Sequence, residues 1–153
     1  MPSSIKYEVA SIANLATTEL NSLAAGSAAL GAEYDNATNL YLHGFFELNV
    51  DFASAPAAGG LIDLYLIPAP DGTTYDDNTV GASEYAPLTT FVGSFPIQAT
   101  ANAQKVPLGG PGFPNLVPLP PCKFKAFLVN NTSQAFPASG STLKMIPYRL
   151  QVV

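Results

Sequence analysis

The chain has 153 residues, which is the size of one domain with a substantial buried core. Only 11% of the residues are charged and 48% are hydrophobic, a composition that excludes salt-bridged helical bundles and coiled coils and argues against disorder. The net charge of −5 argues against a sequence-independent nucleic-acid binder, and no apolar run reaches the roughly 18 residues of a membrane span. We therefore expect a globular domain that binds neither nucleic acid nor membrane.

Residues 1–12 have strand character, because Ile5, Tyr7 and Val9 alternate with polar residues. Such a segment either completes its own sheet or forms an arm that adds to the sheet edge of a neighbour. We expect residues 1–12 to be an N-terminal arm or edge strand, and residues 13–153 to be a single β-sandwich domain. Residues 10–34 are ambiguous between helix and strand, and their Thr-Thr, Asn-Ser and Gly-Ser pairs favour one or two strands.

The clearest strand signal covers residues 40–52, where the even positions are apolar and most odd positions are polar or aromatic. A second strand, residues 61–67, follows a Gly-rich loop. A hairpin that keeps both buried faces together would place Val50 opposite Ile62 and Leu48 opposite Leu64. The residues expected to be buried together are Leu42, Phe46, Leu48, Val50 and Leu64.

The rest of the chain alternates loops and strands. Long loops are expected over residues 71–87 and 106–121, and strands over residues 91–98, 123–130 and 143–153. Pro96 and Pro147 each indicate an edge strand or a bulge. The prediction is an all-β protein with six to eight strands: an antiparallel β-sandwich of jelly-roll type with long Pro/Gly-rich loops.

No catalytic or metal-binding constellation emerges from the sequence. The sequence has no Gly-x-Ser-x-Gly nucleophile elbow with which His43 could act in catalysis. His43 and Cys122 are the only histidine and the only cysteine, which are too few for a zinc site or an internal disulfide. Three carboxylates on neighbouring strands could serve glycoside hydrolysis, and three more in one polar loop could hold Ca²⁺, but both patterns are more typical of solvated acids. The two sets are Glu47, Asp51 and Asp63, and Asp71, Asp76 and Asp77. We expect a protein that is not an enzyme and that has no cofactor.

The charges are divided along the chain. Residues 1–100 hold all 11 acidic residues and a single base, Lys6, whereas residues 101–153 hold five bases and no acid. Either the two regions compensate each other within one sandwich, or the molecule meets copies of itself or a host surface by charge complementarity. Lys123 and Lys125 share one strand face, whereas Lys144 and Arg149 have opposite parity. The candidate interface residues are Ile5, Tyr7, Val9, Lys123, Lys125, Lys144 and Arg149.

Several turn and strand-entry motifs resemble those of small tailed-phage virion proteins of capsid-decoration or accessory type. The resemblance spans roughly residues 35–153 and is carried by Asp35–Leu40, Ala57–Pro68, Leu119–Lys125, Asn130–Thr132 and Ala138–Lys144. Such proteins often have Gly after the double proline, where this chain has Cys122. The family offers no active-site residues.

The resemblance implies a non-enzymatic structural protein that decorates and stabilises a capsid through repeated weak interfaces. Its partners would be the major capsid protein or another virion protein, together with copies of itself. Residues 1–8 lack the apolar stretch of a signal peptide, so we expect a protein made in the host cytoplasm and located in the virion. The alternatives are a carbohydrate-binding module on a virion surface or fibre, favoured by an aromatic row facing a groove, and, more remotely, a hydrolase.

Overall fold

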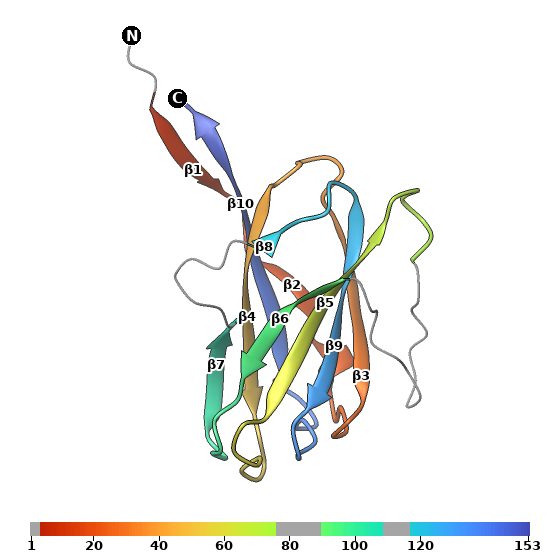
Figure 1. Cartoon of the computed structure of the whole chain (residues 1–153), viewed down its shortest axis with the longest axis vertical. Coiled ribbons are helices and arrows are strands. Elements are labelled where there is room, and N and C mark those ends of the chain that lie inside the picture. Colours follow the sequence, from red (N-terminus) through yellow and green to blue (C-terminus); the bar gives the residue numbers. More distant parts are fainter. Residues whose placement is uncertain (1–3, 76–89, 109–116) are drawn as a thin grey trace.

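The computed structural model describes residues 4–75, 90–108 and 117–153, and within them every regular element is a strand apart from one 3₁₀ turn, Thr18–Leu20 (Figure 1). No helix in these residues is long and apolar enough to cross a membrane. The strands are β1 (Ile5–Val9), β2 (Ala13–Ala16), β3 (Ala28–Asp35), β4 (His43–Asp51), β5 (Leu61–Ala69), β6 (Phe91–Pro96), β7 (Ala103–Pro107), β8 (Val117–Pro118), β9 (Lys123–Asn131) and β10 (Thr142–Val152).

The strands form two antiparallel sheets. Sheet A has the order β1-β10-β4-β7, with β2 also paired to β10 and β8 to β4, and sheet B has the order β3-β9-β5-β6. The pairs β5–β6, β4–β7, β3–β9 and β1–β10 therefore nest from the middle of the chain outward, as in a long hairpin wrapped into two layers. This is the jelly-roll topology, and the predicted fold class is confirmed.

The core lies between the two sheets and is built by alternation along each strand. Phe46, Leu48 and Val50 of β4 point inward and are at most 2% exposed, and Leu64 of β5 is fully buried. The predicted burial of these four residues is confirmed. Leu42 is 54% exposed, so its predicted burial was wrong: it lies before β4 begins, where the alternating pattern of the sequence continues but the strand does not.

The predicted hairpin between residues 40–52 and 61–67 was also wrong. β4 belongs to sheet A, where Val50 pairs with Gln104, and β5 belongs to sheet B, where Ile62 pairs with Asn130 and Phe95. The segment between them crosses from one sheet to the other. Alternation identifies the buried face of a strand, but both sheets of a sandwich need such a face, so the pattern cannot identify the neighbouring strand.

Residues 10–34 contain two strands, as predicted: β2 and β3, with the short 3₁₀ turn in the segment between them. Gly31 allows these strands to approach closely, because a Cβ at this position would lie 2.2 Å from the Leu15 carbonyl oxygen. The loop predicted over residues 106–121 is interrupted by the two residues of β8, and β7 extends to Pro107. Residues 76–89 and 109–116, which include most of the first predicted loop and half of the second, lie outside the described residues.

The two prolines have different positions. Pro96 ends β6, the edge strand of sheet B, as predicted. Pro147 lies in β10, which has neighbours on both sides, and the register shift of β10 lies between Leu143 and Lys144, so the prediction of an edge or a bulge at Pro147 was wrong. It is tolerated because it stands where β10 changes partner from β2 to β1. Its carbonyl accepts the Ala10 N–H at 2.9 Å, so the side of the strand that lacks an N–H faces this junction.

Candidate functional site

A two-stranded ribbon leaves the body of the sandwich (Figure 1). It consists of β1 and the last residues of β10, because β4 accompanies β10 only as far as Tyr148 while β1 pairs with it from Tyr148 to Val152. Reciprocal 2.9 Å hydrogen bonds between the backbones of Ser4 and Val153 close the far end of the ribbon. Both strands therefore project beyond the second sheet that would otherwise cover them.

One face of this ribbon is apolar and open to solvent. The cross-strand pairs Ile5–Val152, Tyr7–Leu150 and Val9–Tyr148 all point to this side. Five of the six side chains are more than half exposed, from 55% for Leu150 to 69% for Ile5 and Val152. These six residues are called the ribbon's apolar face below.

The same stripe continues onto the outer face of sheet A. His43 stacks on Tyr148 with a centroid distance of 5.6 Å, and Phe45 pairs with Ile146 one step further along. A small hollow of about 150 Å³ follows, lined by Ile12, Phe45, Glu47, Lys144 and Ile146. Exposed side chains of this size present on the order of 100 Å² each, so the stripe matches the largest apolar patches of soluble monomers, roughly 300–600 Å², which often mark interaction sites.

The other face of the ribbon is polar and fixes its geometry. Lys6 pairs with Gln151, and Glu8 with Arg149, whose Nε donates to the Glu8 carboxylate at 2.6 Å. The Arg149 guanidinium also donates to the Asn39 carbonyl oxygen at 2.7 Å and lies 5.4 Å from the centre of the Tyr41 ring. The hydrogen bond from Arg149 to Glu8 raises the pKa of the guanidinium. Arg149, a candidate interface residue, therefore ties the ribbon to the sandwich.

The other predicted basic residues lie on the outer faces of both sheets. Lys123 forms a 2.9 Å ion pair with Glu33, and the Lys125 ammonium lies 4.5 Å from the centre of the Tyr75 ring. The Tyr75 hydroxyl donates to Glu33, and this hydrogen bond and the one from Lys123 hold the pKa of the Glu33 carboxyl below its ordinary value. Lys144 is opposite Glu47 on sheet A. The structure thus separates Lys123 and Lys125 from Lys144 and from the ribbon's apolar face.

The carboxylates considered for hydrolysis do not meet. Glu47 and Asp51 lie on β4 in sheet A, whereas Asp63 lies on β5 in sheet B and accepts hydrogen bonds from Ser94 and Asn131. The outward side chains of the two sheets are on opposite sides of the molecule. The expected approach of Asp63 to the other two acids was therefore wrong, for the same reason as the hairpin.

The acidic loop is described only in part. Asp71 accepts the backbone N–H groups of Thr73 and Thr74 at 2.9 and 2.7 Å, and these bonds hold the pKa of its carboxyl well below the ordinary value. Asp76 and Asp77 lie outside the described residues. Within the described ranges, no group of three His, Cys, Asp or Glu residues could hold a metal ion, and Cys122 is a half-buried free thiol.

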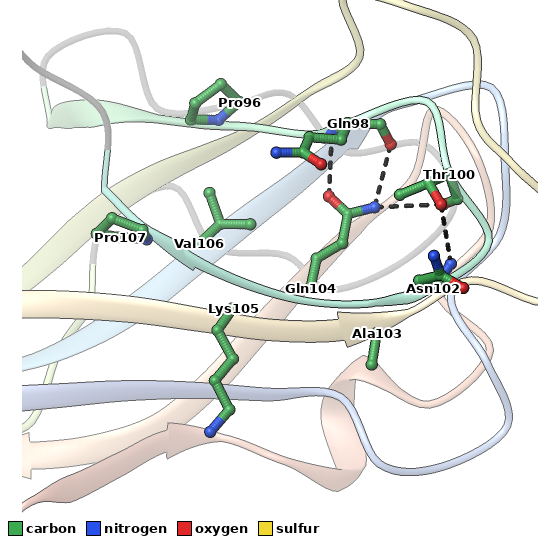
Figure 2. A pocket seen from close by; sticks show the side chains of 9 residues that line it. All are labelled: Pro96, Gln98, Thr100, Asn102, Ala103, Gln104, Lys105, Val106 and Pro107. Atoms are coloured by element: carbon green, nitrogen blue, oxygen red, sulfur yellow. Dashed lines mark hydrogen bonds between the residues drawn. The ribbon is translucent and has the colours of Figure 1, made fainter.

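A larger hollow of about 570 Å³ lies along β7 and the loop that precedes it (Figure 2). Its walls are polar or small: Pro96, Gln98, Thr100, Asn102, Ala103, Gln104, Lys105, Val106 and Pro107. The Gln104 amide is hydrogen-bonded to the backbone of Gln98 at 2.9 and 3.0 Å and to the Thr100 carbonyl at 3.3 Å. The Gln104 side chain therefore holds the preceding loop in place. None of the described residues that line the hollow is aromatic.

Two motifs quoted for the resemblance each contain a fully buried asparagine that binds neighbouring loops. Asn36 is fully buried and bonds the backbone of Tyr41 and the Pro120 carbonyl, each at 2.9 Å. Asn130 is also fully buried, and its amide nitrogen donates to the carbonyls of Leu23, Ala24 and Gln134. The two asparagine side chains therefore stabilise loops against strands and are not exposed for binding.

Leu150 and Val152 belong to the exposed face but were not among the predicted interface residues. The signal was present in residues 143–153, where apolar residues occupy both parities: Leu143 and Met145 on one, Ile146, Tyr148, Leu150 and Val152 on the other. A strand that is apolar on both faces needs a cover on both. On the outer face, Leu150 and Val152 have no cover in the described residues and are 55% and 69% exposed.

Comparison with known proteins identifies no family: no family model matches, and no curated protein matches. Among solved structures, the chain is similar to one from Desmodium yellow mottle tymovirus, with 13% identity and a TM-score of 0.35 over 99% of this chain and 89% of that one. It is also similar to a chain from an empty particle of Kashmir bee virus at acidic pH, with 11% identity and a TM-score of 0.35 over 97% and 92% of the two chains.

Proposed function

We propose that the chain is a non-enzymatic virion structural protein, a capsid decoration protein that attaches to its shell through the ribbon's apolar face. The observation that carries the proposal is the exposure of five apolar side chains on a ribbon that leaves the sandwich. Burying apolar surface contributes roughly 25 cal/mol per Å², so the structure leaves a large binding contribution unused in the free molecule.

The proposed partner is the major capsid protein or another virion protein. A shell repeats one binding site many times, so a contact that is weak in each copy is sufficient when it is specific. In this proposal, residues 1–12 supply the edge strand of the ribbon, and residues 13–153 form the sandwich that it projects from. Lys123, Lys125 and Lys144 would add a salt-sensitive contribution from the outer faces of the sheets.

The carbohydrate-binding alternative has less support. Sugar-binding surfaces are expected to present aromatic rings to a groove, and the larger hollow of the described residues is lined by polar and small side chains instead (Figure 2). The exposed Tyr7 ring stands on the open ribbon beside aliphatic side chains, an arrangement that suits a protein surface better than a sugar.

Particles purified from a culture that produces the chain provide the test. We expect mass spectrometry to find the chain in a fixed ratio to the shell protein, and electron microscopy to place its density on the lattice with the ribbon against the shell. Tyr7→Ser together with Leu150→Ser should lower the occupancy. Phe91→Ser is the matched control, because Phe91 is 54% exposed but lies on sheet B, away from the ribbon. Absence of the chain from purified particles would refute the proposal.

A further inference from the structure

The outer edge of β1 is an unpaired strand edge with a defined pattern of donors and acceptors. β1 ends sheet A, and its even-numbered residues bond to β10: Ser4 exchanges both backbone hydrogen bonds with Val153, and the Ala10 N–H donates to Pro147. Since backbone groups of an antiparallel strand alternate between its two sides, the N–H and C=O groups of Ile5, Tyr7 and Val9 point away from β10. These six groups have no partner strand in the described part of the chain.

The other edges of the two sheets carry features that oppose strand addition, and β1 does not. β2 has only four residues and a register shift in its pairing with β10, and β8 has two residues, one of them Pro118. β6 and β7 both end in a proline, Pro96 and Pro107, which cannot donate a backbone hydrogen bond. β3 has an irregular register between Leu30 and Glu33 that interrupts its pairing pattern. β1 is five residues long, with neither a proline nor a register shift. Of the described edges, this one is suited to accept another strand.

The sequence of β1 is complementary to itself. If two copies of β1 run antiparallel about a two-fold axis at Tyr7, Ile5 faces the other copy's Val9, and Lys6 faces its Glu8. Tyr7 faces Tyr7 as a hydrogen-bonded pair, so the outward groups of Ile5, Tyr7 and Val9 are all satisfied. Lys6 and Glu8 then form two closely spaced, non-hydrogen-bonded pairs of opposite charge, the positions where side chains approach most closely.

We propose that this edge is a homodimer interface, in which β1 of two molecules pairs antiparallel about Tyr7. The dimer contains a continuous four-stranded sheet, β10-β1-β1-β10, across the two ribbons. Its polar side carries the row Arg149, Glu8 and the second copy's Lys6, and a carboxylate has two oxygens with which to accept from both cations. Its apolar side joins the apolar faces of both ribbons into one surface.

The inference goes beyond the proposed function and does not depend on it. It concerns a second copy of the chain and the edge of β1, whereas shell attachment concerns a different protein and the apolar face of the ribbon. An interface of two five-residue strands is far below the roughly 1,200 Å² of a standard stable complex, so we expect a weak dimer. The measurement must therefore cover concentrations from about 1 μM to about 1 mM.

Sedimentation velocity of the full chain and of two charge variants tests the register. Lys6→Glu and Glu8→Lys each place two like-charged pairs across the axis, so each variant alone should dimerise at least about tenfold more weakly than the parent chain. Mixed in equal amounts, the two variants restore both opposite-charge pairs, and the mixture should dimerise like the parent. Lys105→Glu, a charge reversal on β7, is the matched control and should leave association unchanged.

Disulfide trapping gives an independent readout. In a Cys122→Ser background, Tyr7→Cys should yield a covalent dimer on mild oxidation, because Cα atoms about 5.5 Å apart across a hydrogen-bonded pair lie within disulfide range. Lys6→Cys should not, since position 6 faces position 8. A parent chain that stays monomeric over the whole concentration range would overturn the inference. A dimer that both charge variants leave intact, or that Lys6→Cys traps as readily as Tyr7→Cys, would overturn it as well.

Discussion

Replacing Asn130 should destabilise the fold more than any other single polar change in the described residues. Its fully buried side chain makes five hydrogen bonds. The amide nitrogen donates to the carbonyls of Leu23 at 3.2 Å, Ala24 at 3.1 Å and Gln134 at 2.9 Å. The amide oxygen accepts the N–H of Thr132 at 3.1 Å and its hydroxyl at 2.7 Å. The residue thus joins two loops to the end of β9.

Each such bond contributes about 1 kcal/mol net, and a buried partner left unsatisfied costs about 1–3 kcal/mol. If water re-satisfies some of the five partners, Asn130→Ala should lower the free energy of unfolding by about 3–5 kcal/mol, a large part of the 5–15 kcal/mol typical of a domain. Urea denaturation followed by circular dichroism measures this difference directly. An unchanged slope against denaturant would show that stability, and not the compactness of either state, has changed.

The adjacent Asn131 provides the control. It is exposed and makes one 2.7 Å hydrogen bond to Asp63, so Asn131→Ala should cost less than about 1 kcal/mol. Equal losses for the two variants would refute the reasoning, because composition and position in the chain are matched and only burial and bond number differ. A loss below about 1 kcal/mol for Asn130→Ala would refute it too.

Three further changes test the core, the strand packing and the surface charges. Phe46→Ala removes a fully buried ring and should cost about 3–5 kcal/mol in urea denaturation; a loss under about 1 kcal/mol would mean that the faces of β4 are assigned the wrong way round. Gly31→Ala places a Cβ against the Leu15 carbonyl oxygen and should cost about 1–3 kcal/mol, whereas an unchanged midpoint would contradict the close approach of β2 and β3. Glu33 has a pKa lowered in the folded state, so it stabilises the fold above the unfolded pKa of about 4.3, and this contribution disappears as the pH falls through the folded value. The difference in melting temperature between parent and Glu33→Gln should therefore be present at pH 7 and vanish in strong acid; a difference that is independent of pH would contradict the pairing.

The fold class could be predicted from the sequence because it depends on local patterns of apolar and polar residues, which are clear in this chain. Alternation along residues 40–52 required a strand with one buried face, and Phe46, Leu48 and Val50 fill that face in the structure. Small and β-branched residues with little charge excluded the helical alternatives. Strand alternation follows from the two-residue period of the extended backbone, and the buried face follows from the exclusion of apolar side chains from water. Both can be predicted without knowledge of distant contacts.

The neighbours of each strand could not be predicted in the same way. The pairing of β4 with β7 and β10 joins residues about 55 and 100 positions apart, and the inward face of β4 would suit β5 equally well. The predicted position of Asp63 was wrong for this reason, and so was the prediction of an edge or a bulge at Pro147. The exposure of Leu42 and of the ribbon depends on where the second sheet ends, which is a property of the whole sandwich.

The same topology explains why the acidic and basic parts of the sequence are not separated in the folded molecule. A jelly roll places the late strands β9 and β10 between early ones, so bases from the last third of the chain meet acids from the first. Lys123 pairs with Glu33, and Arg149 with Glu8. The bases held in these pairs bring less net charge to a partner than the sequence suggests. The apolar face of the ribbon and the free edge of β1 have no complement in the described part of the chain, and we expect association to depend on them more than on long-range charge attraction.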